Sequence, residues 1–162
     1  MSRLDSFIRR VSVQRDCLNH VAGLIAGVRG PVLELGLGNG RTYDHLRELL
    51  PDREIFVFDR RVAAHPDCIP DEKHMILGDI GETLPGGLAR IGEPAALAHT
   101  DIGTGDAEAN AQIAAFLGRT LPPLMATGSL IVSDQNLNPE GWTRLPLPDG
   151  VPAERYFIYR HP

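Results

Sequence analysis

The stretch Val32-Leu33-Glu34-Leu35-Gly36-Leu37-Gly38-Asn39-Gly40-Arg41-Thr42 decides how the rest of the chain is interpreted. It starts with an aliphatic run after Gly30 and Pro31, which predicts a buried strand entered from a turn. A glycine-rich loop follows, and residues 42–50 then carry apolar side chains at helical spacing. A strand, a glycine loop and a helix in this order bring backbone N–H groups and a helix N-terminus to a polar ligand.

Segments typical of strands and of helices alternate along the remaining chain. The predicted strands lie at residues 54–59, 73–77, 94–101 and 128–134, and the predicted helices lie at 81–92 and 106–117. Two further short strands, 142–147 and 155–160, are expected to join at the turn Pro148-Asp149-Gly150. This order predicts an α/β fold: a doubly wound, mostly parallel sheet with helices on both faces and an antiparallel C-terminal edge hairpin. No linker divides the chain, so residues 1–162 are expected to form a single domain.

The N-terminal residues 1–29 precede the first predicted strand. Within them, residues 3–28 repeat a helical spacing of apolar residues twice, first in Leu4, Phe7, Ile8 and Val11. The pattern predicts one or two amphipathic helices that end near Gly27 and Gly30. These helices could pack on the sheet, form a lid over the ligand site or form an interface, and the sequence leaves the three open.

The composition excludes several classes of protein. Hydrophobic residues make up 43% of the 162 residues and charged residues 23%, which is typical of a folded domain rather than a disordered chain. A net charge of −5 disfavours nucleic-acid binding, because phosphate contacts need a basic surface. Cys17 and Cys68 fit no C-x-x-C pattern and are expected to be free thiols. Because the chain has no membrane-spanning run and no signal peptide, we expect a soluble, cytoplasmic protein.

The spacing of the glycines shows whether the loop fits the pattern of dinucleotide-binding proteins. The dinucleotide-binding pattern is G-x-G-x-x-G, and its third glycine lets the helix pack closely on the strand. Here Gly36 and Gly38 fit the first two positions, but Arg41 occupies the third. The loop instead has the pattern E-x-G-x-G-x-G, in which Glu34 precedes the first glycine by two residues.

Asp59 ends the second predicted strand, about twenty residues after the glycines. A carboxylate at this position can accept hydrogen bonds from both hydroxyls of a ribose. Arg60 and Arg61 follow it, and an arginine there can stack on a purine. Because paired arginines could also bind a 2′-phosphate, an NAD(P)-binding Rossmann oxidoreductase stays open as an alternative.

Residues 34–40 resemble motif I of the class I (Rossmann-like) S-adenosylmethionine-dependent methyltransferases. The resemblance continues with an acid after each of the next three strands and with the terminal hairpin, and it covers about residues 30–162. It implies S-adenosyl-L-methionine as the cofactor. The cofactor-binding residues that it implies are Glu34, Leu35, Gly36, Leu37, Gly38, Asn39, Gly40, Thr42, Asp59, Arg60, Asp79, Ile80 and Asp101.

The same resemblance implies a role for each acid. Glu34 and the glycine loop would face the methionine portion, and Asp59 would bind the ribose hydroxyls. Asp79 would meet the adenine amino group, beside an apolar wall formed by Ile80. Asp101 would lie near the methionine end or the transferring methyl group. An acidic lining suits a cationic sulfonium.

The catalytic residues expected from the sequence are His99, as a general base, and Asp101, because both end the fourth predicted strand. No metal is expected. The alternative is a site formed by Asp101, Asp134 and Asn136, which is similar to the Mg²⁺ site of catechol-type O-methyltransferases, although Gln135 separates the last two residues.

The predicted function is methyl transfer from S-adenosyl-L-methionine to an unidentified acceptor. A cofactor-binding module without transferase activity is the alternative from a different class. A chain of 162 residues leaves almost no room for a separate substrate domain. We therefore expect a small-molecule acceptor, or a pocket completed by the N-terminal helices or by another subunit of a homo-oligomer.

Overall fold

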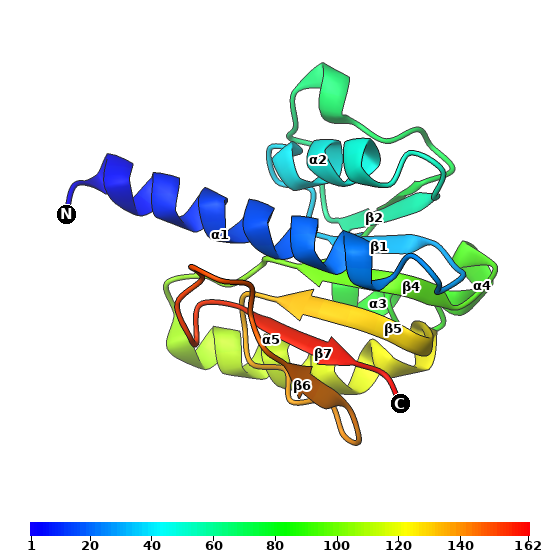
Figure 1. Ribbon diagram of the computed structural model, residues 1–162. Coiled ribbons are helices and arrows are strands. Elements are labelled where there is room, and N and C mark those ends of the chain that lie inside the picture. The colour runs from blue at the N-terminus through cyan, green and yellow to red at the C-terminus, as the bar shows by residue number, and fades with distance from the viewer.

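The computed structural model describes residues 1–162, and its seven strands form one sheet in the order β3-β2-β1-β4-β5-β7-β6 (Figure 1). The glycine loop leaves the central strand, β1 (Val32–Leu35), whose neighbours are β2 (Ile55–Asp59) and β4 (Ala95–Thr100). The other strands are β3 (Met75–Leu77), β5 (Met125–Ser133), β6 (Thr143–Leu145) and β7 (Phe157–Arg160). Strands β1 to β5 are parallel, and β7 runs antiparallel to both of its neighbours. The prediction of a mostly parallel sheet with an antiparallel edge pair is confirmed.

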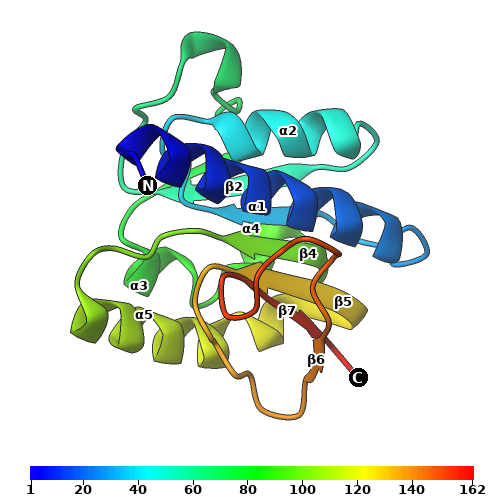
Figure 2. The same ribbon diagram turned by 60° about the vertical axis from the view of Figure 1, so that its left-hand side comes forward.

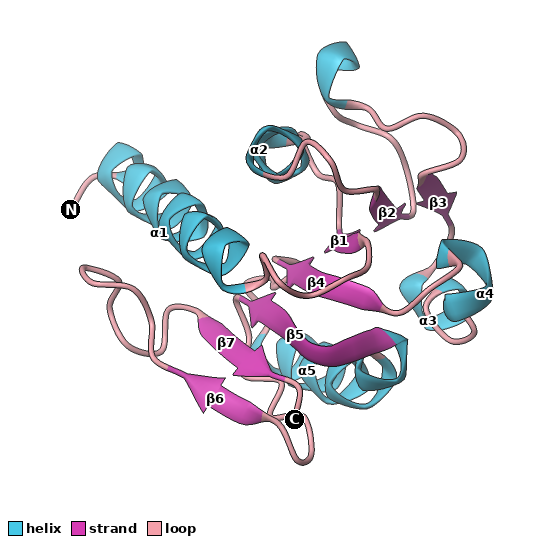
Figure 3. Ribbon diagram, turned by 45° about the vertical axis from the view of Figure 1, so that its right-hand side comes forward, coloured by secondary structure: helices cyan, strands magenta, loops and turns pink.

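Helices cover both faces of the sheet, as the doubly wound prediction requires (Figure 3). One face carries α1 (Arg3–Leu24) and α2 (Arg41–Leu49). The other carries α3 (Ile80–Thr83), α4 (Leu88–Ile91) and α5 (Ala107–Thr120). Two short 3-10 turns, at Pro66–Cys68 and Pro122–Leu124, complete the regular structure.

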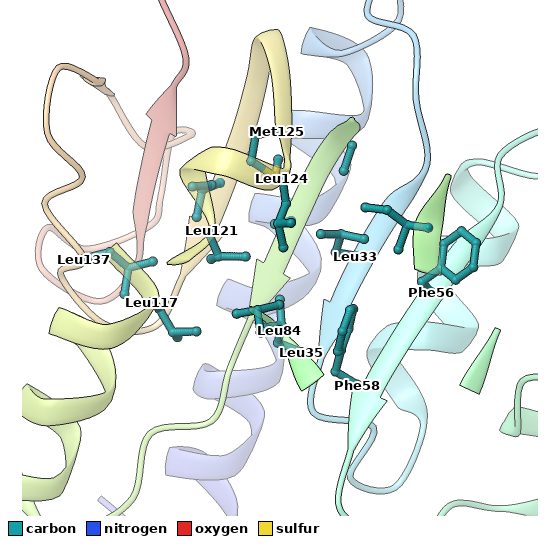
Figure 4. Packing of buried hydrophobic residues seen from close by; sticks show 14 of the residues in the cluster. Leu33, Leu35, Phe56, Phe58, Leu84, Leu117, Leu121, Leu124, Met125 and Leu137 are labelled. Atoms are coloured by element: carbon teal, nitrogen blue, oxygen red, sulfur yellow. The ribbon is translucent and has the colours of Figure 1, made fainter. Parts of the chain in front are cut away.

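The burial of β1 on both faces explains why its sequence does not alternate between apolar and polar residues. Leu33 and Leu35 pack with Phe56 and Phe58 into the cluster on the α5 side (Figure 4). Val32 packs into the opposite cluster, below α1 and α2. A parallel strand covered by helices on both sides has this near-continuous apolar character. Glu34 is the exception, since it is a buried charged residue within an apolar strand.

Residues 81–92 do not form the single helix that the sequence predicts. They contain the end of α3 and the whole of α4, because residues 84–87 interrupt the helical path. Gly86 has a φ of +74°, a left-handed conformation that ends a helical segment. The boundary was predictable in principle from Pro85-Gly86-Gly87, which is a strong turn signal.

The N-terminal segment forms one continuous helix, α1, rather than two. Its second half packs on the sheet through residues such as Leu18 and Val21, which are fully buried. Its first half projects past the edge of the sheet where the parallel strands end (Figures 1 and 2). Leu4 and Ile8 are therefore 66% and 51% exposed. None of the helices combines the length and apolar character that crossing a membrane requires.

Two leucines of α1 provide a matched test of this division. Leu18 is fully buried, whereas Leu4 is 66% exposed. We expect Leu18→Ala to lower the free energy of unfolding by about 2–5 kcal/mol, because it leaves a cavity in a packed core. Leu4→Ala should change it by less than about 0.5 kcal/mol. Urea denaturation of the two variants measures both values. Equal losses of unfolding free energy would contradict the conclusion that the first half of α1 projects beyond the sheet.

Candidate functional site

Two adjoining cavities lie at the carboxyl ends of the central parallel strands. One has a volume of about 300 Å³ and is lined mainly by polar residues of the glycine loop, α1 and the ends of β1, β2 and β4. The other, of about 340 Å³, has apolar walls from Phe58, Ile80 and Ile113. We name them the polar cavity and the apolar cavity. Both are lined by Gly36, Asp59 and Ile102, so one elongated ligand could occupy both. Ligands of α/β sheets bind at this end of the strands.

Other cavities lack this connection to the glycine loop. A cavity of about 720 Å³ lies between α5 and the segment after β5, and one of about 470 Å³ lies at the opposite end of the sheet, beside Arg53. The guanidinium of Arg53 donates hydrogen bonds to the carbonyl oxygens of Ile25, Val28 and Gly30. It thus satisfies carbonyls just beyond the end of α1, which is a structural role.

The glycine loop needs glycine at Gly36 and Gly40 for steric reasons. Both have positive φ angles, +91° and +84°. A Cβ at Gly36 would lie 2.6 Å from the Ile102 side chain, and one at Gly40 would lie 2.5 Å from Cβ of Cys68. The loop therefore passes close to its neighbours, and its backbone lines the polar cavity.

Most of the predicted cofactor residues meet at the two cavities. The polar cavity is lined by Glu34, Gly36, Leu37, Gly38, Asn39, Thr42, Asp59 and Asp101, and the apolar cavity by Gly36, Asp59, Arg60 and Ile80. Three predicted residues line neither cavity: Leu35, Gly40 and Asp79. Leu35 is buried in β1, and Gly40 caps the N-terminus of α2.

Asp59 lies at the junction of the two cavities. Its Oδ2 accepts hydrogen bonds from the backbone N–H of Leu37, at 2.8 Å, and of Gly38, at 3.3 Å. These bonds fix the acid at the end of β2 against the loop after β1. A ligand that bridges the cavities must pass this carboxylate.

Asp79 lines neither cavity, and its carboxylate instead contacts other groups of the protein. It is exposed and caps α3, accepting a hydrogen bond of 2.8 Å from the backbone N–H of Gly81. It also pairs with Arg60 at 3.3 Å. The residues on either side of it, Gly78 and Ile80, do line the apolar cavity. An adenine contact of Asp79 stays a prediction.

A buried hydrogen-bonded network lies beneath the polar cavity. Glu34 is 1% exposed, and its Oε1 accepts a hydrogen bond of 2.5 Å from the hydroxyl of Thr42. Its Oε2 lies 2.7 Å from Nδ1 of the fully buried His99. Nε2 of His99 lies 3.1 Å from the hydroxyl of Tyr156, and that hydroxyl donates to Oδ2 of Asp101 at 2.7 Å.

The charges around His99 favour its protonated form. Burial alone lowers the pKa of an imidazole, but the neighbouring carboxylates, first of all Glu34, outweigh burial, so the pKa of His99 is raised. A protonated ring donates from both nitrogens, to Glu34 and to Tyr156. His99 then has no free nitrogen and lines neither cavity. This placement gives no support to His99 as the general base that the sequence suggested.

Two residues of the alternative metal site accept hydrogen bonds from protein groups. Asn136 Oδ1 accepts a hydrogen bond of 2.5 Å from the hydroxyl of Tyr159, and Asp134 Oδ2 accepts one of 3.0 Å from the backbone N–H of Gly103. Asn136 lines the cavity between α5 and the segment after β5, whereas Asp101 lines the polar cavity. No group of three or more His, Cys, Asp or Glu side chains is arranged to hold a metal ion.

Several residues that line the cavities were not predicted. Helix α1 contributes Arg10, Val11 and Gln14 to the polar cavity, and the Gln14 amide donates to Oδ2 of Asp101. Val11 belongs to the predicted apolar stripe, but nothing in the sequence marks Gln14. Asn110 of α5 lines the apolar cavity and is held by hydrogen bonds of 2.7 Å to the backbone of Thr104.

The donor set of the two cavities fits S-adenosyl-L-methionine. The apolar cavity offers aliphatic and aromatic walls for an adenine ring. Asp59, at the junction, offers carboxylate oxygens to a ribose. The polar cavity is lined by three acids, Glu34, Asp59 and Asp101, and by two arginines, Arg10 and Arg41, so it offers partners to both the ammonium and the carboxylate of the cofactor's amino-acid portion.

The comparison with solved structures agrees with this fit. An S-adenosyl-L-methionine methyl transferase from Silicibacter pomeroyi DSS-3 is 50% identical, with a TM-score of 0.93, over 100% of this chain and 99% of that one. Two more distant structures share the fold alone. CalS11, a TDP-rhamnose 3′-O-methyltransferase, is 19% identical, with a TM-score of 0.63, over 98% of this chain and 81% of that one. A Staphylococcus aureus protein proposed to be a caffeoyl-CoA O-methyltransferase is 12% identical, with a TM-score of 0.60, over 90% and 82% of the two chains.

The sequence comparison leads to the same family. No curated protein matches the chain. The profile of one family, described as S-adenosyl-L-methionine methyltransferase, matches residues 1–161. Nothing in these comparisons supports the nicotinamide alternative. The chain belongs to the S-adenosyl-L-methionine methyltransferase family, and it is an enzyme with S-adenosyl-L-methionine as its cofactor.

Proposed function

We propose that the enzyme transfers a methyl group from S-adenosyl-L-methionine to a small acceptor that enters the polar cavity beside Asp101. The observation that carries this proposal is the pair of cavities joined at Asp59, one apolar and one lined by charged and polar groups. The apolar cavity matches the aromatic base of the cofactor, and the polar cavity matches its charged amino-acid portion. The small size of the acceptor follows from the volume of the polar cavity, about 300 Å³.

The orientation of the cofactor follows from these walls. Phe58, Ile80 and Ile113 enclose the adenine, and Asp59 accepts hydrogen bonds from the ribose hydroxyls. The amino-acid portion then lies in the polar cavity, against the glycine loop and Asp101. The sulfonium comes between the ribose and the amino-acid portion, so the acceptor must approach it from the polar cavity.

The bound cofactor supplies an activated methyl group, which an acceptor atom takes in an in-line displacement. The work left to the protein is to hold the two reactants in line and to accept a proton from the acceptor. Asp101 is suited to accept it because Oδ1 has no protein partner, whereas both oxygens of Glu34 are engaged. Helix α1 closes this side of the cavity with Arg10, Val11 and Gln14.

Cofactor binding tests the first part of the proposal. Isothermal titration should detect binding of S-adenosylhomocysteine and no binding of NAD or NADP. Asp59→Ala should weaken S-adenosylhomocysteine about tenfold to a hundredfold, because hydrogen bonds to a carboxylate contribute about 1.5–3 kcal/mol. The control is Asp52→Ala, which removes an exposed carboxylate far from the two cavities. Equal affinities of the two variants would contradict the role of Asp59.

Turnover tests the second part. Release of S-adenosylhomocysteine should be detected with at least one of three small-acceptor classes: phenols, amines and carboxylates. Asp101→Asn should then lower kcat by about a hundredfold or more, because the amide cannot accept the proton. Asp106→Asn, at the exposed N-cap of α5, is the control. Cofactor binding without turnover in every class would contradict a small acceptor, and full kcat in Asp101→Asn would contradict its role as the base.

A further inference from the structure

The buried network connects two acids of the polar cavity through the middle of the sheet. Glu34 and His99 are direct neighbours in the register of β1 and β4. Tyr156, the residue before β7, extends the network from the C-terminal part of the chain. Segments that are far apart in the sequence therefore converge on one carboxylate, that of Asp101.

The direction of each hydrogen bond is fixed by the protons available. The hydroxyl of Tyr156 has one proton, which it donates to Oδ2 of Asp101, so its oxygen is the acceptor in the contact with Nε2 of His99. That contact needs a proton on Nε2, and the Glu34 carboxylate at the other ring nitrogen favours this by raising the pKa of His99. Burial, together with the charge of Asp101, raises the pKa of Tyr156, so the phenol keeps its proton.

The two oxygens of Asp101 have different environments. Oδ2 accepts hydrogen bonds from Tyr156 and from the Gln14 amide. Oδ1 has no protein partner and is not buried, and the residue lines the polar cavity. The network thus anchors one oxygen of the carboxylate and leaves the other for a ligand.

We propose that Tyr156, held by the buried Glu34–His99 pair, is a positioning residue that orients Asp101 toward the amino-acid end of the cofactor. This inference rests on the proposed orientation of the cofactor. Tyr156 itself does not line the polar cavity and acts through the carboxylate.

Fold stability alone is a weak reason for this network. Taking Glu34 and His99 out of water is costly, and apolar residues of similar volume can often replace a buried ion pair without loss of stability. Neighbouring positions of the same two strands, Leu33 and Ala98, are apolar and fully buried. The polar residues lie where the strands approach the cavity, and their hydrogen bonds end on its wall.

The test compares two tyrosine variants and two ligands. Tyr156→Phe removes the hydroxyl that bonds Asp101. Tyr159→Phe removes the hydroxyl of a residue with the same 2% exposure, which bonds Asn136 away from the polar cavity. The ligands are S-adenosylhomocysteine and 5′-methylthioadenosine, which lacks the amino-acid portion. Isothermal titration gives the dissociation constants, and thermal unfolding gives the midpoint of each variant.

We expect Tyr156→Phe to weaken S-adenosylhomocysteine about tenfold and to change 5′-methylthioadenosine less than about twofold. Tyr159→Phe should change neither affinity, although both variants lose a buried hydroxyl and a lower midpoint is expected for each. Equal weakening of both ligands by Tyr156→Phe would mean a general loss of structure and would overturn the proposal. Unchanged affinity for both would also overturn it.

A second variant keeps the test valid if Tyr156→Phe does not fold. Gln14→Leu removes the other donor to Oδ2 of Asp101 from the half-buried face of α1. It should weaken S-adenosylhomocysteine selectively, by a smaller factor than Tyr156→Phe. Weaker binding of S-adenosylhomocysteine alone supports the anchoring of Asp101. An unchanged ratio of the affinities for S-adenosylhomocysteine and 5′-methylthioadenosine contradicts it. If the wild-type protein binds neither ligand, the proposed orientation of the cofactor fails instead.

Discussion

The buried pair of Glu34 and His99 is the interaction on which the functional end of this molecule depends. It crosses the hydrogen-bonded boundary between β1 and β4, in a sheet whose other central residues are almost all apolar. Neither charge is tolerable there without the other, because burial disfavours each ionised form alone. Each partner also holds a further residue of the site: Glu34 binds Thr42 at the start of α2, and His99 binds Tyr156.

This arrangement assigns different tasks to the acids of the cofactor site. Glu34 is the motif I acid, yet both of its oxygens are occupied by protein donors, so its task is to hold other residues in place. Asp59 fixes the glycine loop at the junction of the two cavities. Asp101 keeps an unpartnered oxygen at the wall of the polar cavity. The acids therefore differ in exposure, from the fully buried Glu34 to Asp101, which lines the polar cavity.

The sequence predicted the fold and the glycine loop because both depend on local patterns. The alternation of apolar strands with helices predicts the sheet, and the spacing from Glu34 to Gly40 predicts a cofactor-binding loop. Contacts between distant segments leave no such pattern. Gln14 and Tyr156 both reach Asp101, from positions 87 and 55 residues away. The partners of His99 could not be predicted for the same reason, since only the folded structure shows that Glu34 and Tyr156 lie at its two ring nitrogens.

The central claim is that one elongated ligand spans both cavities, and a crystal structure of the protein with S-adenosylhomocysteine tests it most directly. We expect the adenine between Phe58, Ile80 and Ile113, with the ribose hydroxyls within hydrogen-bonding distance of Asp59. The amino-acid portion should lie in the polar cavity, against the glycine loop and Asp101. Density for the adenine in the polar cavity, or for the ligand in the cavity of about 720 Å³ between α5 and the segment after β5, would contradict this placement.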